Sequence, residues 1–91
     1  MSPLVRAREL HVGCMRLGPG GSVGYHQATT PQLFAVVEGS GWISSGKDRV
    51  HEPISSGGAV LWDEGEWHEV GTDNGLVAIV VEGAQLAPRL S

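Results

Sequence analysis

Residues 20 to 41 decide the fold of this chain, and they read G-G-S-V-G-Y-H-Q-A-T-T-P-Q-L-F-A-V-V-E-G-S-G. Glycine and proline interrupt the stretch at short intervals, which is typical of tight turns between short strands. One strand is predicted from about Ser22 to Ala28. A second is predicted to begin at Gln32, because the residue before Pro31 is held in an extended conformation. The glycine-rich segment at residues 38 to 41 is predicted to be a turn that reverses the chain into another strand.

The rest of the chain continues this pattern. Further strands are predicted at about residues 10–17, 42–44, 50–54, 59–62, 67–70 and 76–82, with turn-forming residues between them. In the first of these, Val12 and Cys14 share one face, while Met15 and Leu17 share the other. No 12-residue stretch has a clean 3.6-residue apolar period, so little helix is expected. Short strands at this spacing predict an all-β sandwich or barrel.

Composition limits the possible classes of protein. The 91 residues suit one small domain, residues 1–91 with a core at about 10–83, and the net charge is −4. The six basic residues do not cluster, which argues against a nucleic-acid partner. No apolar run reaches the roughly 20 residues that cross a bilayer, and the N-terminus lacks the apolar block of a signal peptide. A soluble cytoplasmic protein is therefore expected. The single cysteine, Cys14, is expected to be a small buried side chain and not a nucleophile.

A second stretch, residues 57 to 69, reads G-G-A-V-L-W-D-E-G-E-W-H-E and completes a pair of spaced motifs. Cupin motif one is G-x5-H-x-H-x3-4-E-x6-G, and its positions fall here on Gly20, His26, Ala28, Gln32 and Gly39. Cupin motif two is G-x5-P-x-G-x2-H-x3-N, and its positions fall here on Gly57, Asp63, Gly65, His68 and Thr72. The chain therefore resembles the cupin superfamily over about residues 13 to 82. The resemblance implies a single antiparallel jelly-roll β-barrel.

The resemblance also implies a metal site with missing ligands. In cupins, both histidines and the glutamate of the first motif bind a divalent metal together with the histidine of the second. His26 and His68 match two of these ligands, whereas Gln32 replaces the carboxylate and Ala28 replaces an imidazole. The tentative metal ligands are therefore His26, Gln32 and His68, for a divalent transition metal such as zinc, nickel, iron, manganese or copper. Losing a charged donor predicts weak binding.

Another interpretation makes the same polar residues the lining of a ligand cavity. Its predicted members are His26, Gln32, His68, Phe34 and Met15, which suit a small and largely apolar ligand. The first hypothesis is therefore a small-molecule-binding cupin of unassigned activity with a weak, degenerate metal site. The alternative is a metal-dependent isomerase, lyase or dioxygenase acting on a small organic acid or sugar derivative. A third is a sensor domain whose cavity reports a ligand. The catalytic residues stay unassigned, because no nucleophile adjoins either histidine.

Other polar and aromatic residues are expected outside the site. Glu69 should point away from its neighbour His68, and Glu64, Glu66 and Glu69 are each expected to be solvated carboxylates. His11 and His51 are expected at the surface. The three tryptophans, Trp42, Trp62 and Trp67, are expected to pack in the core or at a dimer interface and not to line a pocket. A homodimer is predicted, since cupins commonly pair their sheets, with residues 1–9 as an arm that adds a strand to the neighbour's sheet.

Overall fold

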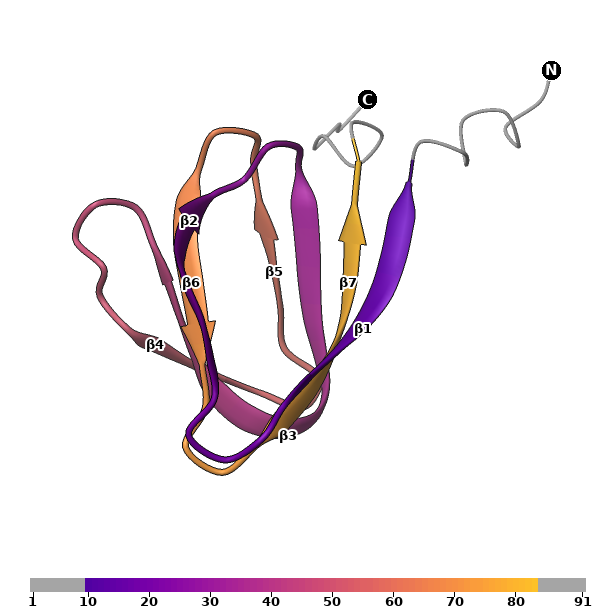
Figure 1. Cartoon of the computed structure of the whole chain (residues 1–91), viewed down its shortest axis with the longest axis vertical. Helices are drawn as coiled ribbons and strands as arrows, with labels where there is room; N and C mark the ends of the chain where they lie inside the picture. The colour runs from indigo at the N-terminus through magenta and orange to yellow at the C-terminus, as the bar shows by residue number, and fades with distance from the viewer. Residues whose placement is uncertain (1–9, 84–91) are drawn as a thin grey trace, which may run out of the picture.

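The computed structural model describes residues 10–83, and this part of the chain consists of seven strands without a helix. The strands are β1 (His11–Leu17), β2 (Ser22–Gln27), β3 (Gln32–Ser45), β4 (Glu52–Ser55), β5 (Ala59–Trp62), β6 (Trp67–Gly71) and β7 (Leu76–Glu82). All pairs are antiparallel, and they curl into a half-barrel (Figure 1). The predicted all-β jelly roll is confirmed. The described residues include no helix long and apolar enough to cross a membrane.

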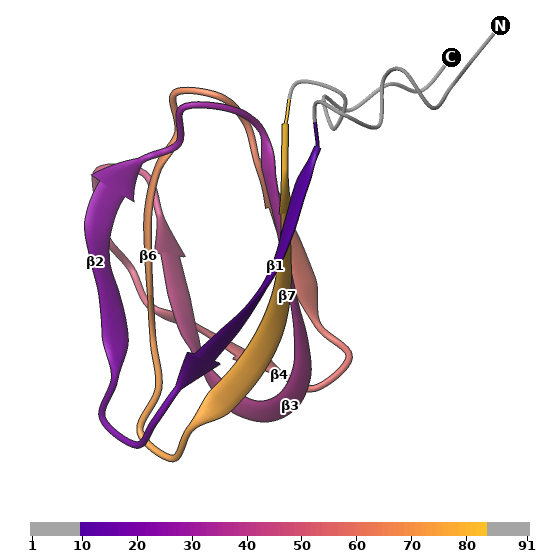
Figure 2. The ribbon, with the colours of Figure 1, turned by 45° about the vertical axis from the view of Figure 1, so that its right-hand side comes forward.

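Strand β3 joins the two sheets of the half-barrel. Its first half pairs with β7 and β5, and β7 in turn pairs with β1. Its second half pairs with β4 and β6, and β6 in turn pairs with β2. We call the first group the β1–β7–β3–β5 sheet and the second the β2–β6–β3–β4 sheet. Figure 2 shows β1 and β7 on the opposite side of the interior from β2.

The predicted turn at residues 38 to 41 is wrong, because β3 continues through it as one bent strand of 14 residues. A register shift between Val36 and Glu38 introduces the bend, and Gly39 adopts a φ of 84°. A β-carbon at Gly39 would collide with the carbonyl oxygen of Gly75, and one at Gly41 would collide with that of Gly71. These glycines therefore let β3 pass close to neighbouring backbone while it crosses between sheets, rather than reversing the chain.

The core lies between the inner faces of the two sheets. Its buried members are Phe34, Val36, Ile43, Ile54, Trp62, Val70, Leu76 and Ala78. Strand β1 has the predicted alternation, since Met15 and Leu17 pack against this core and Val12 lies outside. Cys14 shares the outer face with Val12 and is exposed, so the expectation that it is buried is wrong. The reason is that Cys14 points to the outer face of β1, away from the core, and is exposed there.

The loop between β3 and β4 is tied to the outer face of the β2–β6–β3–β4 sheet through Glu69. The Arg49 guanidinium binds both carboxylate oxygens of Glu69, at 3.0 and 3.1 Å, and the Ser44 hydroxyl donates to the same group at 2.9 Å. Glu69 points away from His68 as expected, but its side chain is only 7% exposed, so the prediction that it is solvated is wrong. The hydrogen bond from Arg49, aided by that from Ser44, holds the pKa of Glu69 below its usual value.

Candidate functional site

His26 and His68 meet on the inner face of the β2–β6 pair, where they are direct cross-strand partners. Their ring centroids lie 4.3 Å apart, and the ring planes are inclined by 62°. Val23 also packs inward, although it lies three positions before His26. In a regular strand the two would face opposite sides, but a register shift between them returns both to the interior. The spacing of the two motifs therefore identified a real pair of side chains.

Both imidazoles are held in the same tautomer by backbone carbonyls. The Nδ1–H group of His26 donates to the Gly24 carbonyl at 2.7 Å, and that of His68 donates to the Glu66 carbonyl at 3.3 Å. Since a carbonyl oxygen only accepts, a neutral ring in this position keeps its lone pair on Nε2. The Nε2 atom of His68 is buried and has no hydrogen-bond partner. Such an atom normally has one, so this nitrogen is suited to a ligand's donor group.

The surroundings of His68 favour its neutral form. Burial lowers the pKa of His68 below its ordinary value, and the nearby imidazole of His26 lowers that pKa further when it carries charge. The hydrogen bond to the Glu66 carbonyl acts in the opposite direction, but its effect is smaller than that of burial. At neutral pH the Nε2 lone pair is therefore available as an acceptor.

Trp62 stacks on the ring of His68, which His26 contacts as well. The indole lies 3.9 Å from the His68 ring, at 11° to it, and Phe34 packs behind the indole at 5.8 Å. The indole N–H donates to the Ser45 hydroxyl at 2.7 Å, so Trp62 is buried without an unsatisfied polar atom. Its predicted place in the core is confirmed. Trp67 differs, since it is 41% exposed and stacks on Tyr25 at the outer face.

Gln32 lies beside Trp62 across the β3–β5 pair, and on its other side it is the direct partner of Glu82 in β7. It lines a pocket of about 240 Å³ whose walls are Gly13, Cys14, Met15, Gln32, Val80 and Glu82. Neither histidine belongs to that lining. Of the five predicted cavity residues, His26 and His68 thus form one pair, Met15 and Gln32 share a pocket, and Phe34 is core. Trp62 lies between the two groups.

Glu82 is the residue at this site that the sequence argument missed. Leu76, Ala78, Val80 and Glu82 alternate along β7, and the first three face the core or pack against it, so Glu82 belongs to the inner face too. That alternation could have identified Glu82 from the sequence. Gln32 begins β3, Trp62 ends β5 and Glu82 ends β7. These three strand ends lie at the same end of the half-barrel as the end of β2 and the start of β6, which are close to the two histidines in sequence (Figure 1). We call this end of the interior the acceptor mouth.

The residues described here do not provide a complete metal site. Nowhere in residues 10–83 do three or more histidine, cysteine, aspartate or glutamate side chains come close enough together to hold a metal ion. The two imidazoles present free Nε2 atoms and would suit a transition metal, but a divalent ion normally needs at least three protein donors. Ala28, which is 5% exposed, occupies the position of the missing imidazole, and Glu69 points to the other face.

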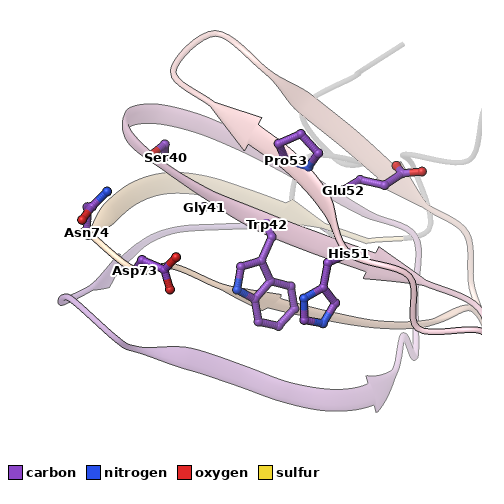
Figure 3. Close-up of a pocket in the computed structure, with 8 residues that line it drawn as sticks. All are labelled: Ser40, Gly41, Trp42, His51, Glu52, Pro53, Asp73 and Asn74. Carbon is purple, nitrogen blue, oxygen red and sulfur yellow. The ribbon is translucent and has the colours of Figure 1, made fainter.

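A second pocket, of about 320 Å³, lies on the outer face of the β2–β6–β3–β4 sheet (Figure 3). Trp42 stacks on His51 there, with ring centroids 3.7 Å apart, and the Trp42 ring fills the space above Gly71 where a β-carbon would stand. The remaining lining residues are Ser40, Gly41, Glu52, Pro53, Asp73 and Asn74. His51 and His11 are exposed, as expected. Among the described residues, the one buried side-chain nitrogen or oxygen without a partner is Nε2 of His68, so the interior site is the stronger candidate.

Comparison with known proteins identifies the fold. No protein-family model and no curated protein sequence matches the chain. Solved structures do: a predicted oxalate decarboxylase from Thermotoga maritima has a TM-score of 0.75 and 23% identity over 91% of this chain and 74% of its own. An RmlC-like cupin from Shewanella frigidimarina has a TM-score of 0.76 and 20% identity, and the match covers 84% of this chain and 67% of the other. An RmlC-like cupin family protein from Methanocaldococcus jannaschii, with a double-stranded β-helix fold, has a TM-score of 0.75 and 14% identity. That match covers 81% of this chain and 69% of the other. The protein therefore has the cupin fold.

Proposed function

We propose that this protein is a small-molecule-binding cupin that takes its ligand at the acceptor mouth, with His26 and His68 as the principal polar contacts. The observation that carries the proposal is the buried Nε2 atom of His68, which has a lone pair and no partner. Leaving such a group unpaired costs about 1–3 kcal/mol, so a ligand that donates a hydrogen bond there recovers that free energy. The reaction, if any, stays unassigned.

The lining residues narrow the class of ligand. Two neighbouring sets of groups at the acceptor mouth offer acceptors: the imidazole nitrogens of the histidine pair, and the Glu82 carboxylate and Gln32 amide oxygen of the adjacent pocket, which the histidines do not line. Met15 and Val80 add an apolar wall. The pocket of about 240 Å³ lies slightly below the roughly 300–1,000 Å³ of typical ligand sites. We infer a small molecule that carries hydroxyl or N–H donors on an apolar body.

Metal binding at this site is proposed to be weak. Two imidazoles can hold a zinc, nickel, copper, iron or manganese ion only loosely, since in the described part of the chain neither a third imidazole nor a carboxylate joins them. One structural neighbour is described as a predicted oxalate decarboxylase. A comparable metal-dependent activity on a small organic acid or sugar derivative is the second candidate, and it would need a ligand set that residues 10–83 do not supply. The cytoplasmic location stays a prediction.

The proposal is tested by observing the imidazole nitrogens directly. In a ¹⁵N-labelled protein at pH 7.5, a small phenol or primary amine that binds at the acceptor mouth should shift the Nε2 resonances of His26 and His68. His68→Asn retains an N–H donor near the Glu66 carbonyl but removes Nε2, so binding should weaken by about tenfold or more. His51→Asn, on the exposed outer face, is the matched control. A panel of such probes that never shifts either histidine would contradict the proposal.

A further inference from the structure

The loop between β3 and β4 places a guanidinium on the outer face of the β2–β6–β3–β4 sheet. Nε and Nη2 of Arg49 donate to the two carboxylate oxygens of Glu69, at 3.1 and 3.0 Å, in the forked geometry that arginine forms and lysine cannot. The same guanidinium lies 4.5 Å from the centre of the Tyr25 ring. A carboxylate and an aromatic face thus bind one guanidinium together. We call Glu69, Ser44 and Tyr25 the guanidinium cradle.

The guanidinium cradle is held by the sheet itself. Glu69 on β6 and Ser44 on β3 are direct cross-strand partners, and the Ser44 hydroxyl donates to the carboxylate at 2.9 Å. Tyr25 comes from β2, and Trp67 stacks on it with ring centroids 5.2 Å apart. The strands therefore set the positions of the carboxylate and the aromatic ring, whichever guanidinium lies between them.

Arg49 occupies the cradle in an unfavourable backbone conformation. Its φ is 53°, and within residues 10–83 it is the only residue other than glycine with a positive φ. Strained residues of this kind gather at ligand-binding and switch sites. The loop also has attachments that do not involve Arg49, since the Tyr25 hydroxyl donates to the Gly46 carbonyl and the Gly46 N–H donates to the Trp67 carbonyl, both at 2.8 Å. An arginine from outside, free of this strain, can replace Arg49 while the start of the loop stays attached.

The pocket of Figure 3 adjoins the cradle through His51. The His51 ring stacks on Trp42, and its Nε2 atom lies 3.9 Å from a Glu69 oxygen. Two further carboxylates, those of Glu52 and Asp73, line this pocket on opposite sides of Trp42 (Figure 3). Neither forms an ion pair within the described part of the chain. Unpaired negative charge therefore lies beside the cradle, where it suits a second basic group of the same ligand.

We propose that this outer face binds an arginine-containing segment of a partner protein, whose arginine takes the guanidinium cradle in place of Arg49. A second basic residue of the segment lies against Glu52 and Asp73. Arg49 is an internal competitor with an effective concentration on the order of millimolar, so only a ligand that also fills the neighbouring pocket displaces it readily. The net charge of −4 favours a basic partner as well. This face lies opposite to the one that carries the histidine pair, so the inference does not depend on the proposed function.

Binding of a capped tetrapeptide with two arginines separated by glycine tests the proposal. Arg49→Ala empties the cradle, so this variant should bind the peptide about tenfold more tightly than the wild type, with amide shifts at Ser44 and Glu69 in ¹⁵N spectra. Adding Glu69→Gln should abolish that gain. The corresponding two-lysine peptide should bind Arg49→Ala about fivefold more weakly, because an ammonium cannot form the fork. Lys47→Ala removes an exposed charge from the same loop and is the matched control, which should bind like the wild type.

Three results would overturn the proposal. A folded Arg49→Ala that binds no more tightly than the wild type would show that Arg49 forms an ion pair of purely structural use. Equal affinity for the arginine and lysine peptides would show only general attraction between opposite charges. Equal affinity for a single capped arginine would show that the neighbouring pocket adds nothing and that no peptide segment is needed.

Arg49→Lys keeps the proposal testable if Arg49→Ala does not fold. It retains the positive charge but loses the fork, so it should compete less well and bind the arginine peptide about threefold more tightly than the wild type. An affinity equal to that of the wild type would overturn the proposal in this variant too.

Discussion

His26 and His68 are direct cross-strand partners whose rings lie 4.3 Å apart, each with its Nδ1 atom on a backbone carbonyl. The arrangement commits both donor hydrogens to the protein and leaves both Nε2 atoms as acceptors. At least one of them, on His68, is buried. Within residues 10–83, no third histidine, cysteine, aspartate or glutamate side chain comes close enough to this pair to hold a metal ion with it.

The stability of the protein should depend on pH through His68. Its pKa in the folded state lies below the value of about 6.5 expected for the unfolded chain. The unfolded state therefore binds more protons between these two values, and the melting temperature should fall as the pH drops below about 6.5. Thermal unfolding from pH 8 to pH 5 measures the effect. The decrease should be smaller in His68→Asn and unchanged in His51→Asn, and an equal decrease in all three proteins would contradict this account.

A second loss of folding stability, at lower pH, should come from protonation of Glu69. Arg49 and Ser44 hold its pKa below the ordinary value, so its contribution is complete above about pH 4.5 and is lost as the pH falls through the folded-state pKa. Glu69→Gln should lower the melting temperature at pH 7 and reduce the further loss near pH 4. Glu64→Gln, at an exposed turn position, is the control. If both variants melt like the wild type at pH 7, the Arg49 ion pair does not stabilise the β3–β4 loop.

Glycine substitutions should separate backbone strain from steric collision. Gly39 and Gly65 both have positive φ, at 84° and 87°. A β-carbon at Gly39 would also strike the Gly75 carbonyl, whereas at Gly65 its nearest neighbour is the Gln27 amide nitrogen at 3.9 Å. Gly65→Ala should cost about 1 kcal/mol and Gly39→Ala at least about 2 kcal/mol. Urea denaturation compares them, and equal losses would show that close backbone approach at Gly39 is unimportant.

The sequence predicted the strands, both histidines and the inner face of β1, because each depends on local alternation or on motif spacing. It did not predict the continuous β3, because a glycine-rich segment that lets a strand bend cannot be distinguished by composition from one that reverses the chain. It also missed the burial of Glu69, because the loop that brings Arg49 over it is 20 residues away in sequence. Exposure of Cys14 depends on which face of β1 meets the core, and the alternation of apolar residues on both faces did not reveal this. The predicted arm, residues 1–9, lies outside the described residues.

Restoring the cupin ligands should strengthen metal binding. Ala28→His together with Gln32→Glu adds an imidazole and a carboxylate, so the double variant should retain close to one equivalent of zinc or nickel after dialysis. Ala28 is buried, and the larger ring must therefore displace its neighbours. The matched control is His51→Ala in the same background, which should not change the metal content. A double variant that folds and still retains no metal would show that Gln32 lies too far from the histidine pair to complete the site.

The most direct test of the central claim, that His26 and His68 form an acceptor pair without a full metal site, is the metal content of the wild-type protein. The protein would be purified without chelator or nickel resin, dialysed and analysed by inductively coupled plasma mass spectrometry. We predict far less than one equivalent of any divalent transition metal, because two imidazoles are too few to hold one through dialysis. About one equivalent of metal, lost in His68→Ala, would contradict the account and would make the metal-dependent enzyme the better hypothesis.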